Sequence, residues 1–329
     1  MHACATSLLP PISTYLGAVG HPLPGAGALR FDDAQEQASA LTGWNQDYLQ
    51  LTAGTFRGEL AQLQGTGIKL FIEQVQQSVF QTGVLPQNVL AFGVPLDSVG
   101  QGMFCGQVCG AQDFHVFSGS SGFEFRSAQQ HTILGVELEL GAGWLQTETG
   151  RGALFPAQAR ALHVSPAALA EVKQYLLKLF QSAHASPQLL ATSAVVSTVA
   201  DYLLDQVSQV VRQGETAGDT KTQWKLVQQA CSLVQSQVED APTVAQLCVD
   251  LGVSRRTLQN SFQKVLNISP LAYLKALRLG HARRALKRMD SVTEAATSSG
   301  FWHFGHFSQD YQAMFGERPS DTLKRHHGV

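Results

Sequence analysis

The last third of the sequence contains one pattern twice, 48 residues apart, and this repeat constrains the fold more than any other feature. The segment "TVAQLCVDLGVS" at position 243 matches "SVTEAATSSGFW" at position 291. Each copy opens with Ser or Thr and carries Gln246 or Glu294 three residues later, which predicts a capping box and a short helix. A glycine follows each helix, Gly252 or Gly300, and suits the left-handed turn that ends a helix.

A second helix is predicted after each glycine turn. Leu258 and Phe262 in the first copy, and Phe307 and Tyr311 in the second, are i, i+4 pairs that would pack inward. A short helix, a tight turn and a second amphipathic helix form the helix-turn-helix pattern, in which the second helix enters the major groove of DNA.

The outer face of each second helix carries the candidate DNA contacts. Arginine can bind guanine through two hydrogen bonds, and Gln or Asn can do the same for adenine. The first helix has the higher positive charge, so we expect it to contribute more of the affinity. The predicted contacts are Arg255, Arg256, Gln259, Asn260 and Gln263 in the first unit, and His303, Gly305, His306, Ser308, Gln309 and Gln312 in the second.

The segment between the two units, residues 269–289, predicts one helix with a basic face. Some twenty helical residues span about 30 Å, and successive major-groove faces on one side of DNA lie about 34 Å apart. A rod of this length could present both second helices to one side of a duplex. The predicted phosphate contacts are Ser254, Thr257, Lys275, Arg283, Arg284 and Lys287.

Charge is divided unevenly along the chain. Residues 220–329 contain 14 Lys+Arg and 8 Asp+Glu, a net charge of +6, whereas residues 1–219 have a net charge of -8. This asymmetry indicates that only the C-terminal third meets a polyanion.

Residues 41–140 consist of short apolar runs broken by Gly, Pro and Asp-Ser, which predicts antiparallel strands and hairpins. Several such strands imply a cupin-like β-barrel or sandwich with room for a small ligand. Further along, Ser165-Pro166 and Ser186-Pro187 each predict the start of an apolar helix. These two helices would pack either on the sheet or on a partner subunit.

The predicted class is therefore α+β, with a β-rich sensor domain and an all-α double helix-turn-helix domain. The expected segments are a flexible N-terminus (1–30), the β-rich sensor domain (31–164), a helical dimerisation segment (165–213), a linker (214–223) and the DNA-binding domain (224–329).

Three pairs of residues invite a metal interpretation, and each has a simpler one. Cys105 and Cys109 lack a second Cys/His pair at finger-like spacing, which favours buried thiols. A third ligand is missing beside His303 and His306, and the isolation of His115 and His131 favours ordinary packed histidines. We therefore predict no metal site and no definite cofactor.

Five scattered cysteines, the absence of a secretory signal and the absence of an apolar run of about 18 residues predict a cytoplasmic protein without membrane contact.

Residues 225–326 resemble the AraC/XylS type of transcriptional regulators. The matching features are the double-unit layout and the segments "TVAQLCVDLGVSRRTLQNSFQKVLNISPLAYL", "RLGHARRAL" and "VTEAATSSGFWHFGHFSQDYQAMFGERPSDT". The resemblance implies a regulator, in most members an activator, with promoter DNA, RNA polymerase and a second copy of the chain as partners.

Upstream, "GWNQDYLQLTAGTFRGEL", "LAFGVPL" and "HTILGVELE" resemble the branch of that family that controls ethanolamine utilisation. This finer resemblance implies a small-molecule effector, an amine or alcohol such as ethanolamine together with cobalamin. The sequence departs from that expectation in one respect, because it contains no D-x-H-x-x-G cobalamin signature.

Two alternatives of other classes are an enzyme and a protein-interaction module, each with a basic helical tail. No nucleophile–base arrangement, carboxylate pair or phosphate-cradling loop in the sequence supports the enzyme. Two helices with groove-reading faces argue against the interaction module. The sequence thus predicts a one-component transcriptional regulator that is not an enzyme.

Overall fold

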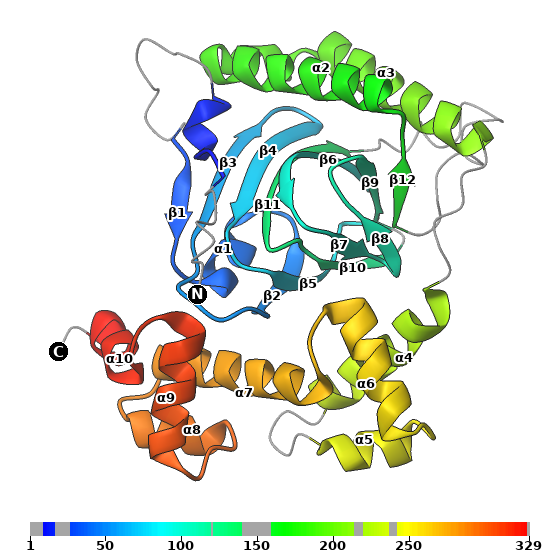
Figure 1. Cartoon of the computed structure of the whole chain (residues 1–329). Helices are drawn as coiled ribbons and strands as arrows, with labels where there is room; N and C mark the ends of the chain where they lie inside the picture. Colours follow the sequence, from blue (N-terminus) through cyan, green and yellow to red (C-terminus); the bar gives the residue numbers. More distant parts are fainter. Residues whose placement is uncertain are drawn as a thin grey trace, which may run out of the picture. The chain divides into compact units, whose positions relative to one another are not determined.

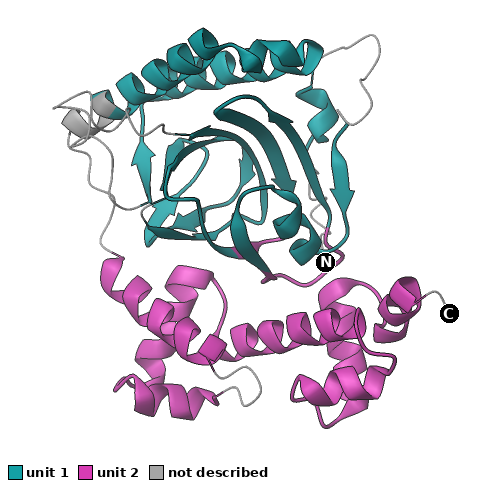
Figure 2. Ribbon diagram, turned by 180° about the vertical axis from the view of Figure 1, so that it is seen from behind, with its two compact units in different colours: residues 1–48, 57–76, 81–218 teal, residues 49–56, 77–80, 219–329 magenta. Residues whose placement is uncertain are grey.

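The computed structural model describes residues 9–16, 27–119, 121–139, 159–213, 220–236 and 242–327 (Figure 1). The chain divides into two compact units, which Figure 2 shows in different colours. Unit 1 comprises residues 1–48, 57–76 and 81–218, and unit 2 comprises residues 49–56, 77–80 and 219–329. The predicted α+β architecture, a sheet domain followed by an all-helical domain, is confirmed.

The larger of two sheets has seven strands in the order β1-β3-β4-β11-β6-β9-β12. Every neighbouring pair in it is antiparallel, as the short runs and tight turns predict. A register shift between Thr132 and Ile133 bends the long central pair of β11 and β6. The strands are β1 (Leu29–Phe31), β3 (Gly58–Gln64), β4 (Ile68–Val75), β11 (Gln130–Glu139), β6 (Val89–Val99), β9 (Asp113–Ser118) and β12 (Arg160–His163).

A five-stranded sheet lies against the first and has the order β2-β5-β10-β7-β8. Aromatic side chains from both sheets meet in one apolar cluster, for example Phe104 and Phe125 from the second sheet with Phe117 from the first. The strands are β2 (Asn45–Gln50), β5 (Val79–Val84), β10 (Gly122–Arg126), β7 (Gly102–Phe104) and β8 (Gln107–Cys109).

Helices α2 (Pro166–Ala185) and α3 (Ser193–Gln213) cover the outer face of the seven-stranded sheet (Figure 1). Leu176 and Phe180 of α2 and Leu203 of α3 are buried in one core with alternate residues of β4 and β11. The sequence left open whether these helices pack on the sheet or on a partner subunit, and the structure shows that they pack on the sheet. Ser165 caps α2 as predicted, since its Oγ accepts a hydrogen bond from the N–H of Ala168 at 3.3 Å.

The predicted helix start at Ser186-Pro187 is wrong. Residues Pro187–Ala191 form only a 3-10 turn, η2, and Thr192 is extended (φ -90°, ψ 117°). The carbonyl of Thr192 accepts the first backbone bonds of α3, from Val195 and Val196. The helix therefore begins at Ser193, after the proline turn.

Part of the segment predicted to be a flexible N-terminus is described and packs on the sheet. Residues 9–16 include the 3-10 helix η1 (Ile12–Thr14). Ile12 is fully buried in the sheet core, and its N–H donates to Glu59 Oε2 at 2.9 Å. Residues 1–8 and 17–26 lie outside the described part of the chain.

Unit 2 contains the helices α4 to α10 of the described residues, and the first of them begins inside the segment predicted as a linker. Residues 214–219 of the predicted linker lie outside the described residues, but α4 starts at Lys221, inside the predicted linker. None of the helices in the described residues is long and apolar enough to cross a membrane. The helices are α4 (Lys221–Ser236), α5 (Val244–Asp250), α6 (Arg255–Leu266), α7 (Pro270–Leu286), α8 (Val292–Ser298), α9 (Phe304–Phe315) and α10 (Pro319–His327).

Candidate nucleic-acid interface

The first helix-turn-helix motif consists of α5 and α6, and its caps follow the sequence prediction. Thr243 Oγ1 accepts a hydrogen bond from the N–H of Gln246 at 3.2 Å, and Gln246 Oε1 accepts one from the N–H of Thr243 at 3.1 Å. Gly252 turns the chain with φ +63°, a conformation that costs glycine nothing. Ser254 Oγ then accepts from the N–H of Thr257 at 3.1 Å and begins α6.

One face of α6 is buried and the opposite face is exposed. Leu258 and Phe262 have no exposed surface, and the Phe262 ring packs on Tyr273 of α7 with ring centroids 5.6 Å apart. This contact fixes the rotation of α6, so its polar side chains face away from the core. The exposed residues include all five predicted contacts of the first unit, Arg255, Arg256, Gln259, Asn260 and Gln263.

The second motif consists of α8 and α9 and is capped less completely. Ser291 Oγ accepts from the N–H of Glu294 at 3.3 Å, but the return bond to the Glu294 carboxylate that a capping box requires is not formed. The predicted second capping box is thus only half present. Gly300 has φ +77°, as predicted, and Phe307 and Tyr311 are fully buried.

The exposed face of α9 is polar but carries no cation. His303 is the N-cap residue of α9 rather than part of the helix. His303, Gly305, His306, Gln309 and Gln312 are exposed, and Ser308 is half-buried. A Cβ atom on Gly305 would meet nothing within 4 Å, so the backbone there is open to close approach. α6 contains Arg255, Arg256 and Lys264, whereas α9 contains neither Lys nor Arg.

The predicted phosphate contacts differ in their surroundings. Ser254 and Thr257 are exposed, with their hydroxyls 2.9 Å apart. Lys275 is exposed and forms an ion pair with Asp310 Oδ1 at 2.5 Å. Arg284 and Lys287 are half-buried.

Arg283 does not suit a phosphate contact. Only 7% of the residue is exposed, and its Nη2 lies 3.0 Å from Glu317 Oε1. Its guanidinium also lies over the ring of Phe315, 4.6 Å from the centroid. Arg283 therefore holds α7 against the end of α9 and the turn into α10, and we remove it from the predicted phosphate contacts.

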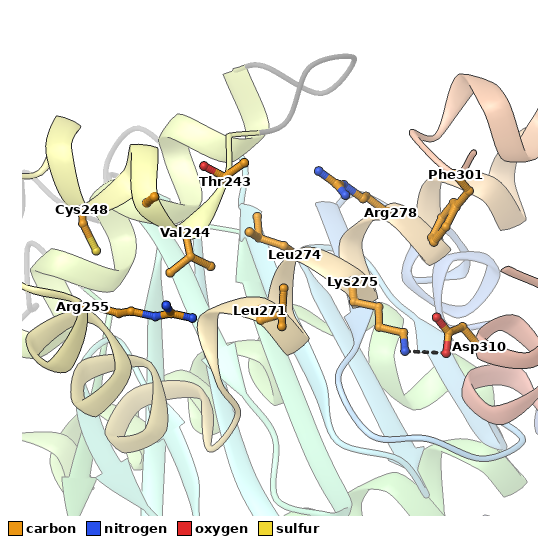
Figure 3. Close-up of a pocket in the computed structure, with 11 residues that line it drawn as sticks. Thr243, Val244, Cys248, Arg255, Leu271, Leu274, Lys275, Arg278, Phe301 and Asp310 are labelled. Carbon is orange, nitrogen blue, oxygen red and sulfur yellow. Dashed lines mark ion pairs between the residues drawn. The ribbon is translucent and has the colours of Figure 1, made fainter. Parts of the chain in front are cut away.

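The connecting helix is shorter than predicted. α7 runs over 17 residues instead of some twenty, which corresponds to about 25 Å. The two motifs pack at opposite ends of it (Figure 1). Arg255 at the start of α6 and Asp310 of α9 both line one groove that crosses α7, so the two second helices border the same side of the unit (Figure 3).

Two exposed aromatic residues in the second motif were not among the predicted contacts. Trp302 is 73% exposed and precedes His303 in the turn before α9, and Phe304, the first residue of α9, is 43% exposed. Because they lie beside the predicted contacts of the second motif, they are two further candidate contacts. The signal in the sequence was the run "FWHF" at the start of the second helix.

Two pairs of histidines, His115 with His131 and His303 with His306, invited a metal interpretation in the sequence. The described residues contain no group of three or more His, Cys, Asp or Glu that could hold a metal ion. His115 and His131 are buried in the sheet core, with ring centroids 6.4 Å apart. Burial lowers the pKa of His115 to about 3, with a smaller contribution from His131, and lowers the pKa of His131 to about 4. Both imidazoles are therefore neutral near pH 7.

The chain is similar to known proteins over part of its length. A protein-family model described as a helix-turn-helix domain matches residues 247–325. The "XylDLEGF operon transcriptional activator 2" of Pseudomonas putida is 30% identical over 133 residues, which cover 39% of this chain and 82% of that protein. The "Probable thc operon regulatory protein" of Rhodococcus erythropolis is 34% identical over 147 residues, which cover 42% of this chain and 44% of that protein. The match thus spans less than half the length of the Rhodococcus relative.

Solved structures are similar to this chain as well. One of them is a probable AraC family transcriptional regulator from Rhodopseudomonas palustris CGA009; the match is 37% identical and covers 31% of this chain and 97% of that chain, with a TM-score of 0.30.

Proposed function

Because the chain belongs to the AraC/XylS family of helix-turn-helix transcriptional regulators, we propose that it activates transcription from a promoter that α6 and α9 read in two successive major-groove segments. The observation that carries this proposal is the pair of second helices at the two ends of α7, each with a buried i, i+4 pair and a polar exposed face. A regulator of this family is not an enzyme.

The residue roles in this proposal follow from exposure and chemistry. Arg255 and Arg256 lie on the first turn of α6, where side chains of a recognition helix reach base edges. Gln259, Asn260 and Gln263 lie on the same face of α6. An amide side chain can form two hydrogen bonds with an adenine base. In the second motif, Gly305 allows close approach, and hydrogen bonds would come from the side chains of His303, His306, Ser308, Gln309 and Gln312.

Phosphate contacts are proposed for the polar residues that border these faces. Ser254 and Thr257 lie at the N-terminal end of α6, where the helix dipole favours an anion. Arg284 and Lys287 of α7 add positive charge along the connecting helix, and Lys275 would exchange its ion pair with Asp310 for a phosphate. Such contacts set register and affinity without reading sequence.

The length of α7 adds a consequence for the DNA. A connecting helix of about 25 Å is shorter than the spacing of about 34 Å between major-groove faces on straight DNA. We therefore include in the proposal that the duplex bends toward the protein, which brings the two groove segments closer together.

The sheet domain is proposed to sense a small-molecule effector, and α2 and α3 are proposed to form a homodimer through their surface away from the sheet. An amine or alcohol such as ethanolamine with cobalamin remains the effector to test first, on the resemblance of the upstream segments alone. RNA polymerase is the further partner that activation requires. In this scheme the effector shifts the population in which both motifs are placed for DNA.

Selection of bound fragments from a random DNA library by the full chain tests the DNA-reading part of the proposal. The expected product is a site with two recognised segments whose centres lie about one helical turn apart. Arg256→Ala should relax the preference at one base position in the segment under α6. Recovery of fragments without a shared sequence would contradict the proposal.

Transcription from the selected site, with and without ethanolamine and adenosylcobalamin, tests the effector separately. An increase only when the small molecules are present supports the predicted effector. Unchanged transcription with both molecules removes it and leaves the DNA-reading proposal intact.

A further inference from the structure

The second helices of the two motifs correspond residue by residue. α6 and α9 each contain 12 residues, and in both helices the fourth and the eighth residue have no exposed surface. These buried residues are Leu258 and Phe262 in α6, and Phe307 and Tyr311 in α9. Each helix is followed by a C-cap residue in the left-handed conformation, Asn267 or Gly316. This equivalence fixes which residues of the two motifs occupy the same place on the helix.

The first turn of the helix differs in chemistry between the two motifs. α6 begins with Arg255 and Arg256, whereas α9 begins with Phe304 and Gly305. All four residues are exposed. Both arginines belong to the proposed base-reading face, so Phe304 occupies the place of a base-reading residue. The second motif thus presents an aromatic ring and an open backbone where the first motif presents two cations.

Packing within unit 2 does not account for an aromatic ring at this place. Phe301, in the turn before α9, is half-buried and packs on Phe307 with ring centroids 4.9 Å apart. Phe304 remains 43% exposed instead, so part of the free energy that burial of its ring would supply is not gained. A polar side chain at the start of α9 would avoid this loss. A ligand therefore explains the ring better than the core does.

The base edges in the major groove select the partner of such a ring. Guanine presents two acceptors, which suit the guanidinium donors of Arg255, but a phenyl ring has no donor for them. Thymine presents its C5-methyl group, which apolar side chains, including Phe, contact. The exposed residues His303, His306 and Gln309 near Phe304 can bond the polar atoms of the bases. The ring thus lies among proposed groove-reading residues, and a thymine methyl group is the partner that fits it.

We infer that Phe304 recognises a thymine, through the C5-methyl group of the base, in the DNA segment read by the second motif. This inference rests on the proposed function and deepens it. The two motifs read different bases from the same helix position, guanine through Arg255 and thymine through Phe304. Because Gly305 has no side chain, the base edge can approach closely beside the ring.

Uracil-containing DNA tests the inference, because deoxyuridine differs from thymidine only in the missing methyl group. Each thymine in the second segment of the selected site is replaced in turn, and the dissociation constant of the full chain is measured by fluorescence anisotropy. One replacement should weaken binding by the parent about fourfold, which corresponds to about 0.8 kcal/mol for one buried group of this size. Phe304→Ala should bind both DNAs with the affinity of the parent for the uracil DNA.

Two further variants show whether the methyl effect belongs to Phe304. Phe304→Leu keeps an apolar side chain and should keep most of the effect. Arg255→Ala is the matched control, because it weakens binding at the other motif and should keep the full fourfold effect, which is expected of independent sites. Since Phe304 and Arg255 are exposed, no substitution removes a fully buried side chain. Far-ultraviolet circular dichroism verifies that the variants keep the helical content of the parent.

Three results would overturn the inference: a parent whose affinity responds to none of the replacements, an equal response in the parent and in Phe304→Ala, or loss of the response in Arg255→Ala as well as in Phe304→Ala. Parental DNA affinity of Phe304→Ala together with reduced transcription would also overturn it, and would assign the ring to a protein partner. A selection that yields no shared sequence contradicts the proposed function and the inference together, whereas the first three results leave the proposed function intact.

Discussion

Arg283 and Arg284 are neighbours in the sequence, yet the structure predicts opposite consequences when each is replaced by alanine. Arg283 is buried between α7 and the end of α9, with its guanidinium on Glu317 and over Phe315. Arg284 is half-buried and is a proposed phosphate contact. Arg283→Ala should therefore destabilise unit 2 and leave the salt dependence of DNA binding unchanged.

The contacts of Arg283 set the expected loss of stability in Arg283→Ala. Removal of one partner from a buried ion pair costs about 3–5 kcal/mol, and loss of a desolvated cation–π contact accounts for about 2 kcal/mol of such a change. Glu317 keeps two other partners, a hydrogen bond from Thr322 Oγ1 at 2.8 Å and the guanidinium of Arg325. Because these two partners remain, Arg283→Ala does not leave the Glu317 carboxylate unpaired. We therefore expect the free energy of unfolding to fall by about 3 kcal/mol, the lower end of that range.

Urea unfolding of the full chain, followed by helical circular dichroism, measures the stability change. Fluorescence anisotropy of labelled site DNA across a salt series measures the slope of log affinity against log salt. Arg284→Ala is the matched control and should lower that slope by about 0.9 with little effect on unfolding. An Arg283→Ala protein with parental unfolding and a reduced salt slope would show that the assignment of Arg283 to the core is wrong.

Three further changes test other parts of the structure. Arg256→Ala should weaken binding to the selected site by about 1–3 kcal/mol, measured by anisotropy, and parental affinity would exclude Arg256 from base reading. Gly252→Ala should cost roughly 1–2 kcal/mol of stability, because φ is +63° but the new Cβ meets nothing within 4 Å; a loss well above that in urea unfolding would mean that the turn is tightly packed. The pKa values of His115 and His131 are lowered by burial to about 3 and about 4, so only the unfolded chain takes up these protons as the pH falls from about 6.5. Stability of the sheet unit should therefore fall between pH 6.5 and pH 4, by at most about 1.4 kcal/mol per pH unit for each histidine, and His115→Leu should flatten the profile of urea midpoint against pH; an unchanged profile would contradict the burial.

The features of unit 2 that could be predicted from sequence are those with local causes. A Ser or Thr cap, an i, i+4 apolar pair and a glycine at a left-handed turn each act over a few residues. The rotation of α6 and α9 followed from the pairs Leu258–Phe262 and Phe307–Tyr311, and the exposed faces were predicted with it. The half-formed cap at Ser291 differs because the Glu294 side chain does not return to the backbone.

The features that sequence reasoning missed depend on contacts between distant segments. Arg283 lies in a run of basic residues, and only packing against Glu317, 34 positions later, separates it from its neighbours. Ile12 lies in a segment rich in Pro and Gly, yet it is held in the sheet core through Glu59. The groove over Leu271 arises where α5, α7 and α9 come together, and no single helix pattern encodes it.

The uneven charge of the two second helices has a consequence for promoters. α6 carries Arg255, Arg256 and Lys264, whereas α9 carries no Lys or Arg. Most of the binding energy for DNA would therefore come from the first motif. Base changes beneath α9 would then be tolerated more readily over evolutionary time than those beneath α6. Related promoters under this regulator should therefore drift faster in one half of the operator than in the other.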